Sequence, residues 1–328
     1  MSISLCLIVK NEEKVLERCL VSFKGIYNDL VIVDTGSIDN TKNIAEKYNA
    51  RIFDFKWIDD FSAARNYAIS KAESDYIMMV DADDYIEEQD REKLIHVINE
   101  KLNQVDGFYL PYLLPSKNGD HKKSYFPKIW KSDLNLVYKQ RIHEYLDITE
   151  EIVESFIKIE IPIKTEGDFA DSFDRNLRIL NQAIIEEPQN TRYLYYLGHD
   201  NQYSGHVHEA IYWYERFIDL GNTTNRDELN RVYRNKALCH LKLSETPEAV
   251  VCLRKAIETN PNFVIPYLLL GDIEMKRKNY ESAVKYYAAA NKCKPPRTHL
   301  YINESQYKDL AQKKLENLIE HYKQNAEV

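Results

Sequence analysis

The hydrophobic pattern of this 328-residue chain changes its period near residue 170. Before that point, short apolar runs alternate with amphipathic stretches, a pattern typical of a mostly parallel sheet covered by helices. From Asp174 onward the pattern is helical throughout. Because these two patterns belong to different architectures, we expect an α/β domain at residues 1–170 and an all-α domain at residues 171–328.

The composition excludes several classes of protein. Apolar residues make up 44% of the chain and charged residues 29%, as in a soluble globular protein with a substantial core. The formal net charge of −8 gives no bulk attraction to nucleic acid or to an anionic membrane. Five scattered cysteines do not form a disulfide framework. No segment has the pattern of a signal peptide or the roughly 20 apolar residues of a membrane span, so a cytoplasmic location is expected.

Strands are expected in the first domain wherever a short apolar run occurs. These runs lie at 4–9, 30–33, 51–55, 76–81, 107–114, 124–130, 136–138 and 157–163. Amphipathic stretches at 13–22, 41–48 and 61–72 are expected to form helices. Because parallel strands end at the same edge of a sheet, the loops after the first strands should meet there.

The strand expected at 76–81 runs into a cluster of carboxylates. Asp81 and Asp83 are two residues apart, and their oxygens suit a hard divalent cation, which in turn can neutralise a diphosphate. The same sequence is also compatible with a solvated loop whose carboxylates cap the next helix. The spacing alone favours neither interpretation.

Two further residues stand at the ends of predicted elements. Asp34 follows the strand at 30–33, and its carboxylate can accept a hydrogen bond from a nucleobase or serve as a simple turn residue. Arg65 lies in the first turns of the helix expected at 61–72, where its planar fork can meet a phosphate or form a surface ion pair.

The helical half contains a repeat. Small residues at 198, 237 and 271 are each followed twelve positions later by alanine and four positions after that by Tyr214, Leu253 or Tyr287. Pro261 and Pro295 fall where the second helix of a unit should end. The pattern resembles about three and a half tetratricopeptide repeats, with a charged capping helix expected at about 304–324.

Four motifs of the first domain occur in order within 84 residues. They are Ile8-Val9-Lys10-Asn11-Glu12-Glu13, Val33-Asp34-Thr35-Gly36-Ser37 with Asp39 and Thr41, Ser62-Ala63-Ala64-Arg65-Asn66, and Val80-Asp81-Ala82-Asp83-Asp84. Together with Arg141-Ile142-His143-Glu144, they resemble the family 2 glycosyltransferases. The resemblance implies a GT-A fold, which is a Rossmann-like mixed sheet, and a nucleotide-diphosphate sugar as donor, with a UDP-sugar favoured.

The resemblance also implies roles for individual residues. Asp34 is expected at the base, Glu12 near the ribose and Arg65 near the diphosphate. The expected nucleotide-sugar site consists of Val9, Glu12, Asp34, Arg65, Asp81 and Ala82. Asp83 and His143 are the expected ligands of a Mn or Mg ion. Glu144 and Asp84 are the two candidates for the base that deprotonates the acceptor in an inverting displacement.

The acceptor side is less defined. Related chains often carry a histidine in the strand before the linker, where this chain reads Ile163-Lys164-Thr165-Glu166-Gly167. We expect the repeats to recognise a polypeptide or glycan acceptor, or to mediate homo-oligomerisation, although most tyrosines there should pack between helices. The alternative is a non-catalytic scaffold in which the first domain is a degenerate nucleotide-sugar domain.

Overall fold

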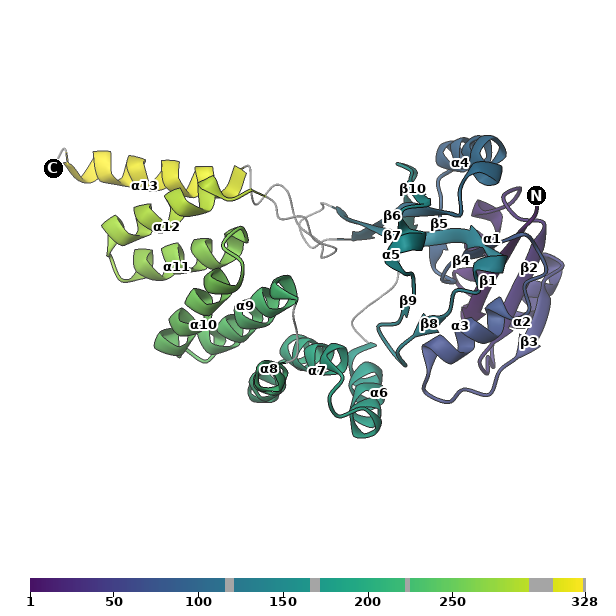
Figure 1. The fold of residues 1–328 in the computed structure, drawn as a ribbon, viewed down its shortest axis with the longest axis horizontal. Helices are drawn as coiled ribbons and strands as arrows, with labels where there is room; N and C mark the ends of the chain where they lie inside the picture. The colour runs from purple at the N-terminus through teal and green to yellow at the C-terminus, as the bar shows by residue number, and fades with distance from the viewer. Residues whose placement is uncertain (116–120, 166–171, 222–224, 295–308, 327–328) are drawn as a thin grey trace. The chain divides into compact units, whose positions relative to one another are not determined.

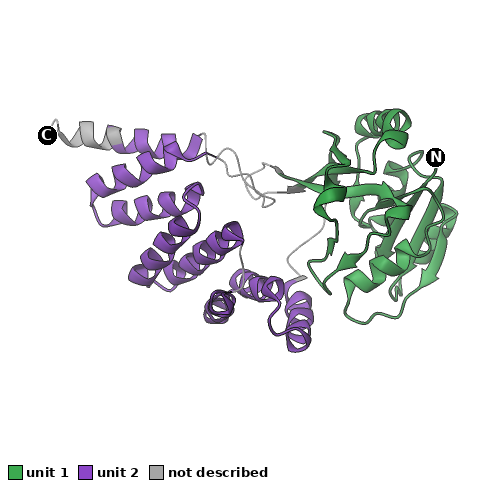
Figure 2. Ribbon diagram, in the orientation of Figure 1, with its two compact units in different colours: residues 1–170 green, residues 171–328 purple. Residues whose placement is uncertain are grey.

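The computed structural model of the chain describes residues 1–115, 121–165, 172–221, 225–294 and 309–326. It divides into unit 1, Met1–Ala170, and unit 2, Asp171–Val328, which have different colours in Figure 2. Unit 1 contains strands with helices on both sides, whereas the described part of unit 2 is helical (Figure 1). The predicted fold class, an α/β domain with a mixed sheet followed by a helical domain, is confirmed.

The sheet of unit 1 has nine strands among the described residues. Its parallel half contains, in spatial order, β3 (Arg51–Asp54), β2 (Asp29–Asp34), β1 (Ile3–Val9) and β4 (Tyr76–Met79). The other half contains β7 (His121–Lys131), β6 (Gly107–Pro115), β10 (Phe156–Lys158), β11 (Ile163–Thr165) and β5 (Asp84–Tyr85). β7 is antiparallel to both β4 and β6, so the sheet is mixed.

Both faces of the parallel half are buried, which explains the uninterrupted apolar runs. Leu5 and Leu7 of β1 belong to one core cluster, and Cys6 between them belongs to another. The helices of unit 1 are α1 (Leu16–Ser22), α2 (Thr41–Lys47), α3 (Phe61–Ile69), α4 (Glu88–Lys101) and α5 (Glu150–Val153). The first cluster includes residues of α1 and α4, and the second includes Ala68 of α3.

Two predicted strands differ from the structure. The strand expected at 136–138 is only β8 (Tyr138–Lys139), which pairs with β9 (Tyr145–Leu146) outside the main sheet. The strand expected at 157–163 is two strands, β10 and β11, which both pair with β6. Pro162 lies between them and has no N–H to continue a ladder.

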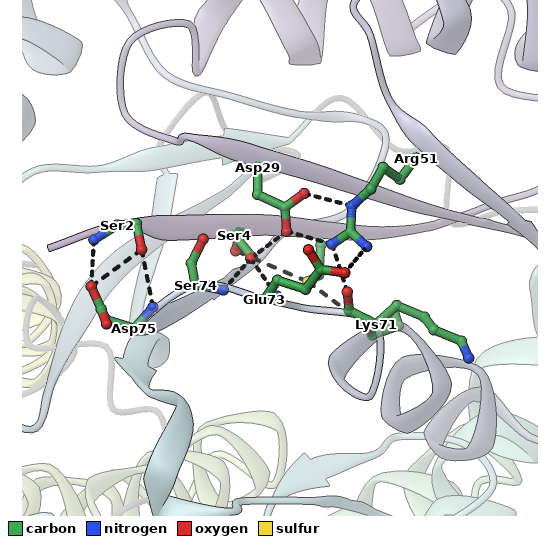
Figure 3. Close-up of polar contacts among 10 residues, drawn as sticks. Ser2, Ser4, Asp29, Arg51, Lys71, Glu73, Ser74 and Asp75 are labelled. Carbon is green, nitrogen blue, oxygen red and sulfur yellow. Dashed lines mark hydrogen bonds and ion pairs between the residues drawn. The ribbon is translucent and has the colours of Figure 1, made fainter.

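A polar network joins the amino ends of the parallel strands (Figure 3). Arg51 of β3 donates through Nε and Nη2 to the two carboxylate oxygens of Asp29, at 2.8 and 2.7 Å. Its Nη1 lies 2.8 Å from Glu73, and the Ser4 hydroxyl of β1 donates to Asp29 at 2.5 Å. Asp29 therefore connects β1, β2 and β3 at the edge of the sheet opposite the strand carboxyl ends.

Removing the charge of Asp29 should destabilise unit 1. Burial opposes ionisation of Asp29, but hydrogen bonds from Arg51 and Ser4 outweigh it and lower the pKa of this carboxyl. We expect Asp29→Asn to lower the unfolding free energy by about 1–3 kcal/mol at pH 7, measured by urea denaturation. A carboxyl with a lowered folded-state pKa stabilises above its unfolded value of about 3.9 and loses that effect as the pH falls further.

The difference in unfolding free energy between wild type and Asp29→Asn should therefore become smaller as the pH falls below about 4. Asp147→Asn is the control, because Asp147 pairs with Lys139 on the surface, and such pairs contribute at most about 1 kcal/mol. Equal losses in the two variants would contradict the structural role of Asp29.

Unit 2 is a series of antiparallel helix pairs. The helices are α6 (Ser172–Glu186), α7 (Thr191–Ser204), α8 (Val207–Leu220), α9 (Arg226–Lys242), α10 (Thr246–Thr259), α11 (Val264–Lys276), α12 (Tyr280–Lys292) and α13 (Ala311–Ala326). α7 packs on α8, α9 on α10 and α11 on α12 (Figure 1). α13 corresponds to the predicted capping helix, of which positions 304–308 lie outside the described residues. None of the described helices has the length and apolarity needed to cross a bilayer.

The repeated positions form the contacts within each pair. A Cβ atom added to Gly271 of α11 would lie 2.3 Å from a ring carbon of Tyr287 of α12. A Cβ atom on Gly198 of α7 would likewise lie 2.5 Å from the Tyr214 ring of α8. In the middle pair the small residue is alanine, at position 237, and the partner is a leucine, at position 253, in the same core cluster. Glycine thus occurs opposite tyrosine, and alanine opposite leucine.

Candidate active site

The loops that follow β1 and β2 are bonded to each other. The Thr35 backbone N–H donates to the carbonyl of Val9 at 2.9 Å. The Glu12 backbone N–H donates to the hydroxyl of Thr41 at 2.7 Å. The structure therefore brings the β1 end, with Val9 and Glu12, next to the β2 end that carries Asp34.

Asp34 is buried with one carboxylate oxygen unsatisfied. Its Oδ1 accepts hydrogen bonds from the backbone N–H groups of Gly36 and Ser37, both at 2.9 Å. Gly36 has φ of 109°, which allows the chain to turn back over the carboxylate. Asp34 is 1% exposed, and its Oδ2 has no hydrogen-bond partner among the described residues. Since a buried acceptor without a donor is costly, Oδ2 is suited to an N–H of a ligand.

Arg65 lies between two carboxylates from different parts of the chain. Helix α3 begins with Asp60 as its N-cap, and Arg65 follows in its second turn. Arg65 Nη2 donates to Asp81 Oδ1 and Nε donates to Glu144 Oε1, each at 2.7 Å. Burial opposes ionisation of Asp81, but Arg65 and Lys128 outweigh it and lower its pKa. The predicted residues Arg65, Asp81 and Glu144 thus lie together.

Asn66 fixes the segment that precedes Glu144. Its amide donates to the Tyr138 carbonyl at 2.9 Å and accepts from the Tyr138 N–H at 2.7 Å. The N–H of Phe61 donates to the Arg141 carbonyl at 2.8 Å. His143 follows with φ of 52°, in the left-handed region. The start of α3 thereby positions the segment that carries His143 and Glu144.

Asp84 is fully buried. Its carboxylate accepts hydrogen bonds from the Tyr112 hydroxyl, from Lys128 Nζ at 3.2 Å and from the Asp81 backbone N–H at 3.0 Å. Burial raises the pKa of Asp84 to about 6, against the opposing effect of Lys128. Because its side chain is buried and bonded on three sides, Asp84 can hold the turn after β4 in shape.

Asp83 is bonded to the strand that ends unit 1. The hydroxyl of Thr165 in β11 donates to Asp83 Oδ2 at 2.7 Å. Burial raises the pKa of Glu12 to about 7, and the negative charges of Asp83 and Asp81 contribute to this rise. Glu12 therefore lies near the turn that carries these two carboxylates.

The carboxylates fit a divalent cation in chemistry but do not form a complete site. Asp81 and Asp83 offer hard oxygen ligands, and after burial their negative charges are the next cause of the raised pKa of Glu12. Across the part of the chain that the structure describes, no three His, Cys, Asp or Glu side chains gather closely enough to hold a metal ion. His143 is therefore not grouped with Asp83 in such a set.

The structure adds residues that sequence reasoning missed. Tyr112 and Lys128 hold Asp84, Thr165 holds Asp83, and Asn66 holds the segment before His143. Asn66 could have been predicted from the sequence, because it adjoins Arg65 in the motif at residues 62–66. The other three lie on β6, β7 and β11, and no local pattern links them to the Asp81 turn.

Comparisons with known proteins agree with this geometry. Residues 4–162 match the model of glycosyl transferase family 2, and residues 266–296 match a tetratricopeptide repeat. The SPbeta prophage-derived glycosyltransferase SunS of Bacillus subtilis is 24% identical over 223 residues, covering 65% of this chain and 52% of SunS. A TPR repeat-containing protein of Synechococcus elongatus is 48% identical over 82 residues, covering 25% of this chain and 20% of that protein.

Among solved structures, residues 1–349 of S. aureus TarS in complex with UDP are 16% identical, with a TM-score of 0.44. This likeness covers 79% of this chain and 91% of that one. The chain spans about half or less of the length of the two curated relatives. Residues 4–162 form a glycosyl transferase family 2 domain, and residues 266–296 of unit 2 form a tetratricopeptide repeat.

Proposed function

We propose that the protein is a metal-dependent, inverting glycosyltransferase that moves a sugar from a nucleotide-diphosphate donor, preferably a UDP-sugar, to a polypeptide or glycan acceptor. The main support for a nucleotide donor is the unsatisfied Oδ2 of buried Asp34, at the carboxyl ends of the parallel strands. An ionised carboxylate accepts but does not donate, so the base must present an N–H, as the imide of uracil does.

The other residues of the site are proposed to contact the parts of the donor beyond the base. Glu12 is proposed to meet the ribose and Arg65 the diphosphate, with Val9 and Ala82 forming buried walls. Arg65 is 11% exposed and held on two sides, so its charge is fixed before the donor arrives. Preorganised charge of this kind stabilises a leaving diphosphate more than it stabilises the bound donor.

Asp81 and Asp83 are proposed to hold the divalent cation, Mn or Mg, which when bound would supply further positive charge for the diphosphate. Because the structure groups no three such side chains, phosphate oxygens are proposed to complete the set of ligands. Thr165 would then orient Asp83 through its hydroxyl.

The choice of general base is narrowed by burial. Glu144 is 14% exposed, whereas the Asp84 carboxylate is fully buried and bonded to Tyr112 and Lys128. A base must reach the proton that it removes. We therefore assign the base role to Glu144 and a positioning role to Asp84.

Asp34→Asn tests the donor site. The amide can still accept from Gly36 and Ser37 through its oxygen, but it places a donor where Oδ2 must accept. We expect UDP binding, measured by titration calorimetry with Mn²⁺, to weaken at least about tenfold.

The matched control is Asp147→Asn. Asp147 is a surface carboxylate of unit 1 that pairs with Lys139. We expect this variant to bind UDP as the wild type does. If wild type and Asp34→Asn bind UDP equally well, Asp34 does not accept a hydrogen bond from the base.

A further inference from the structure

One face of α7 in unit 2 carries a row of aromatic rings. Tyr195, His199 and Tyr203 are spaced four residues apart, which places them on one side of the helix. The ring centres of Tyr195 and His199 are 5.9 Å apart, and those of His199 and Tyr203 are 4.6 Å apart. Tyr203 is 64% exposed, so the row ends at the surface.

Two arginines of the neighbouring helix α9 face this row. The Arg231 guanidinium lies 5.7 Å from the centre of the Tyr195 ring, and its Nη1 is 3.5 Å from the Tyr195 hydroxyl. Arg234 donates through Nε and Nη2 to the side-chain oxygen of Asn235, at 3.2 and 2.9 Å. Asn235 in turn donates to the Tyr214 hydroxyl, which fixes the plane of the Arg234 guanidinium.

Neither guanidinium forms an ion pair with a carboxylate among the residues that the structure describes. Asp200, the carboxylate of the aromatic face, is buried and bonded to His199 at 2.8 Å. Burial lowers the pKa of Arg234, and the like charge of Arg231 lowers it further. A buried cation beside a second cation is unfavourable until an anion joins them.

We propose that Arg231 and Arg234 bind a carboxylate of an acidic polypeptide segment whose neighbouring apolar side chains pack on the Tyr195–His199–Tyr203 row. A guanidinium matches a carboxylate in two-point geometry, and Asn235 accepts from Nε and Nη2 of Arg234, which leaves the Nη1/Nη2 edge of that guanidinium for the carboxylate. This inference rests on the proposed polypeptide acceptor and adds that the acceptor is acidic and that Arg231 and Arg234 bind it.

The surroundings favour a polypeptide over a uniformly charged polymer. The two cations lie one helical turn apart and are flanked by uncharged rings, which suits a chain that alternates acidic and apolar groups. A phosphate polymer carries a charge on every unit and would need a longer basic track.

The test uses the full chain and a fluorescein-labelled peptide of repeated Glu-Gly-Leu, read by fluorescence anisotropy. The same peptide with Gln in place of Glu is the ligand control. We expect saturable binding of the Glu peptide and at least about tenfold weaker binding of the Gln peptide. The Arg231→Gln/Arg234→Gln variant should lose at least about tenfold in affinity.

Arg216→Gln is the matched protein control, because Arg216 of α8 lies over the Trp213 ring outside the proposed site. This variant should bind the Glu peptide as the wild type does. Arg234→Lys, which keeps the charge but loses the fork, should fall between wild type and the double variant. Thermal melts followed by circular dichroism confirm that each variant is folded.

Equal binding of the Glu and Gln peptides would overturn the proposal, as would unchanged affinity in the double variant. Polyphosphate that binds through Arg231 and Arg234 while the Glu peptide does not would also overturn it. The measurement contains no nucleotide, sugar donor or metal. Its failure is therefore distinct from failure of the transferase assignment, which donor turnover tests separately.

Discussion

The Arg65→Gln variant is expected to turn over the sugar donor about 10²–10³-fold more slowly than wild type, the scale seen when one preorganised donor is removed from a site of developing charge. Two effects combine. The leaving diphosphate loses a fixed cation, and Asp81 and Glu144 lose the group that holds them at 2.7 Å. Measuring nucleoside diphosphate release under saturating donor separates this loss from weaker binding.

Two variants control the Arg65 result. Arg91→Gln removes an arginine that pairs with Glu88 within α4, and it should leave turnover unchanged. Arg65→Lys keeps the charge without the fork, so it should recover only part of the rate. A folded Arg65→Gln protein with wild-type turnover would show that the Arg65 cluster is structural only.

In the repeats, Gly271→Ala is expected to lower the unfolding free energy by about 2 kcal/mol. The new Cβ would lie 2.3 Å from the Tyr287 ring, so the ring or the helix must shift. Overpacking of this kind costs about 1–3 kcal/mol, which exceeds the roughly 1 kcal/mol that alanine gains over glycine within a helix. The change in unfolding free energy is measured by chemical denaturation of the whole chain, followed through the loss of the helical signal.

The same substitution should reverse its sign when the ring is absent. The middle repeat pairs Ala237 with Leu253, and Gly271→Ala with Tyr287→Leu reproduces that pair. In a Tyr287→Leu background, Gly271→Ala should stabilise by up to about 1 kcal/mol, because only the helix propensity remains. A loss of equal size in both backgrounds would rule out the glycine–tyrosine contact as the cause.

Much of the fold follows from local pattern. The runs that predicted β1, β2 and β4 are apolar because both faces of that part of the sheet are covered. The repeat was visible because small residues recur where paired helices touch. Helix α4 had no predicted counterpart, since only two of its residues, Leu94 and Ile98, are buried and the rest of its pattern is weak.

What the sequence could not supply was long-range order. β7 lies between β4 and β6 although it follows both in the chain, and no local signal specifies that insertion. For the same reason the sequence left Asp84 and Glu144 as two equal candidates for the base. The assignment of Asp84 depends on Tyr112 and Lys128, which arrive from β6 and β7. Asp34 and Arg65, by contrast, stand at element ends whose convergence the parallel pattern predicts.

We propose above all that this chain transfers a sugar from a nucleotide donor with the help of a metal ion. A panel of nucleotide sugars, incubated with the wild-type protein and Mn²⁺ and followed by mass spectrometry for slow donor hydrolysis, tests it directly. We predict that one donor is consumed, that chelation abolishes its consumption, and that Asp83→Asn reduces the rate at least about 10²-fold. No turnover of any donor, together with weak UDP binding that ignores both Mn²⁺ and Asp83→Asn, would contradict the claim and identify a non-catalytic scaffold.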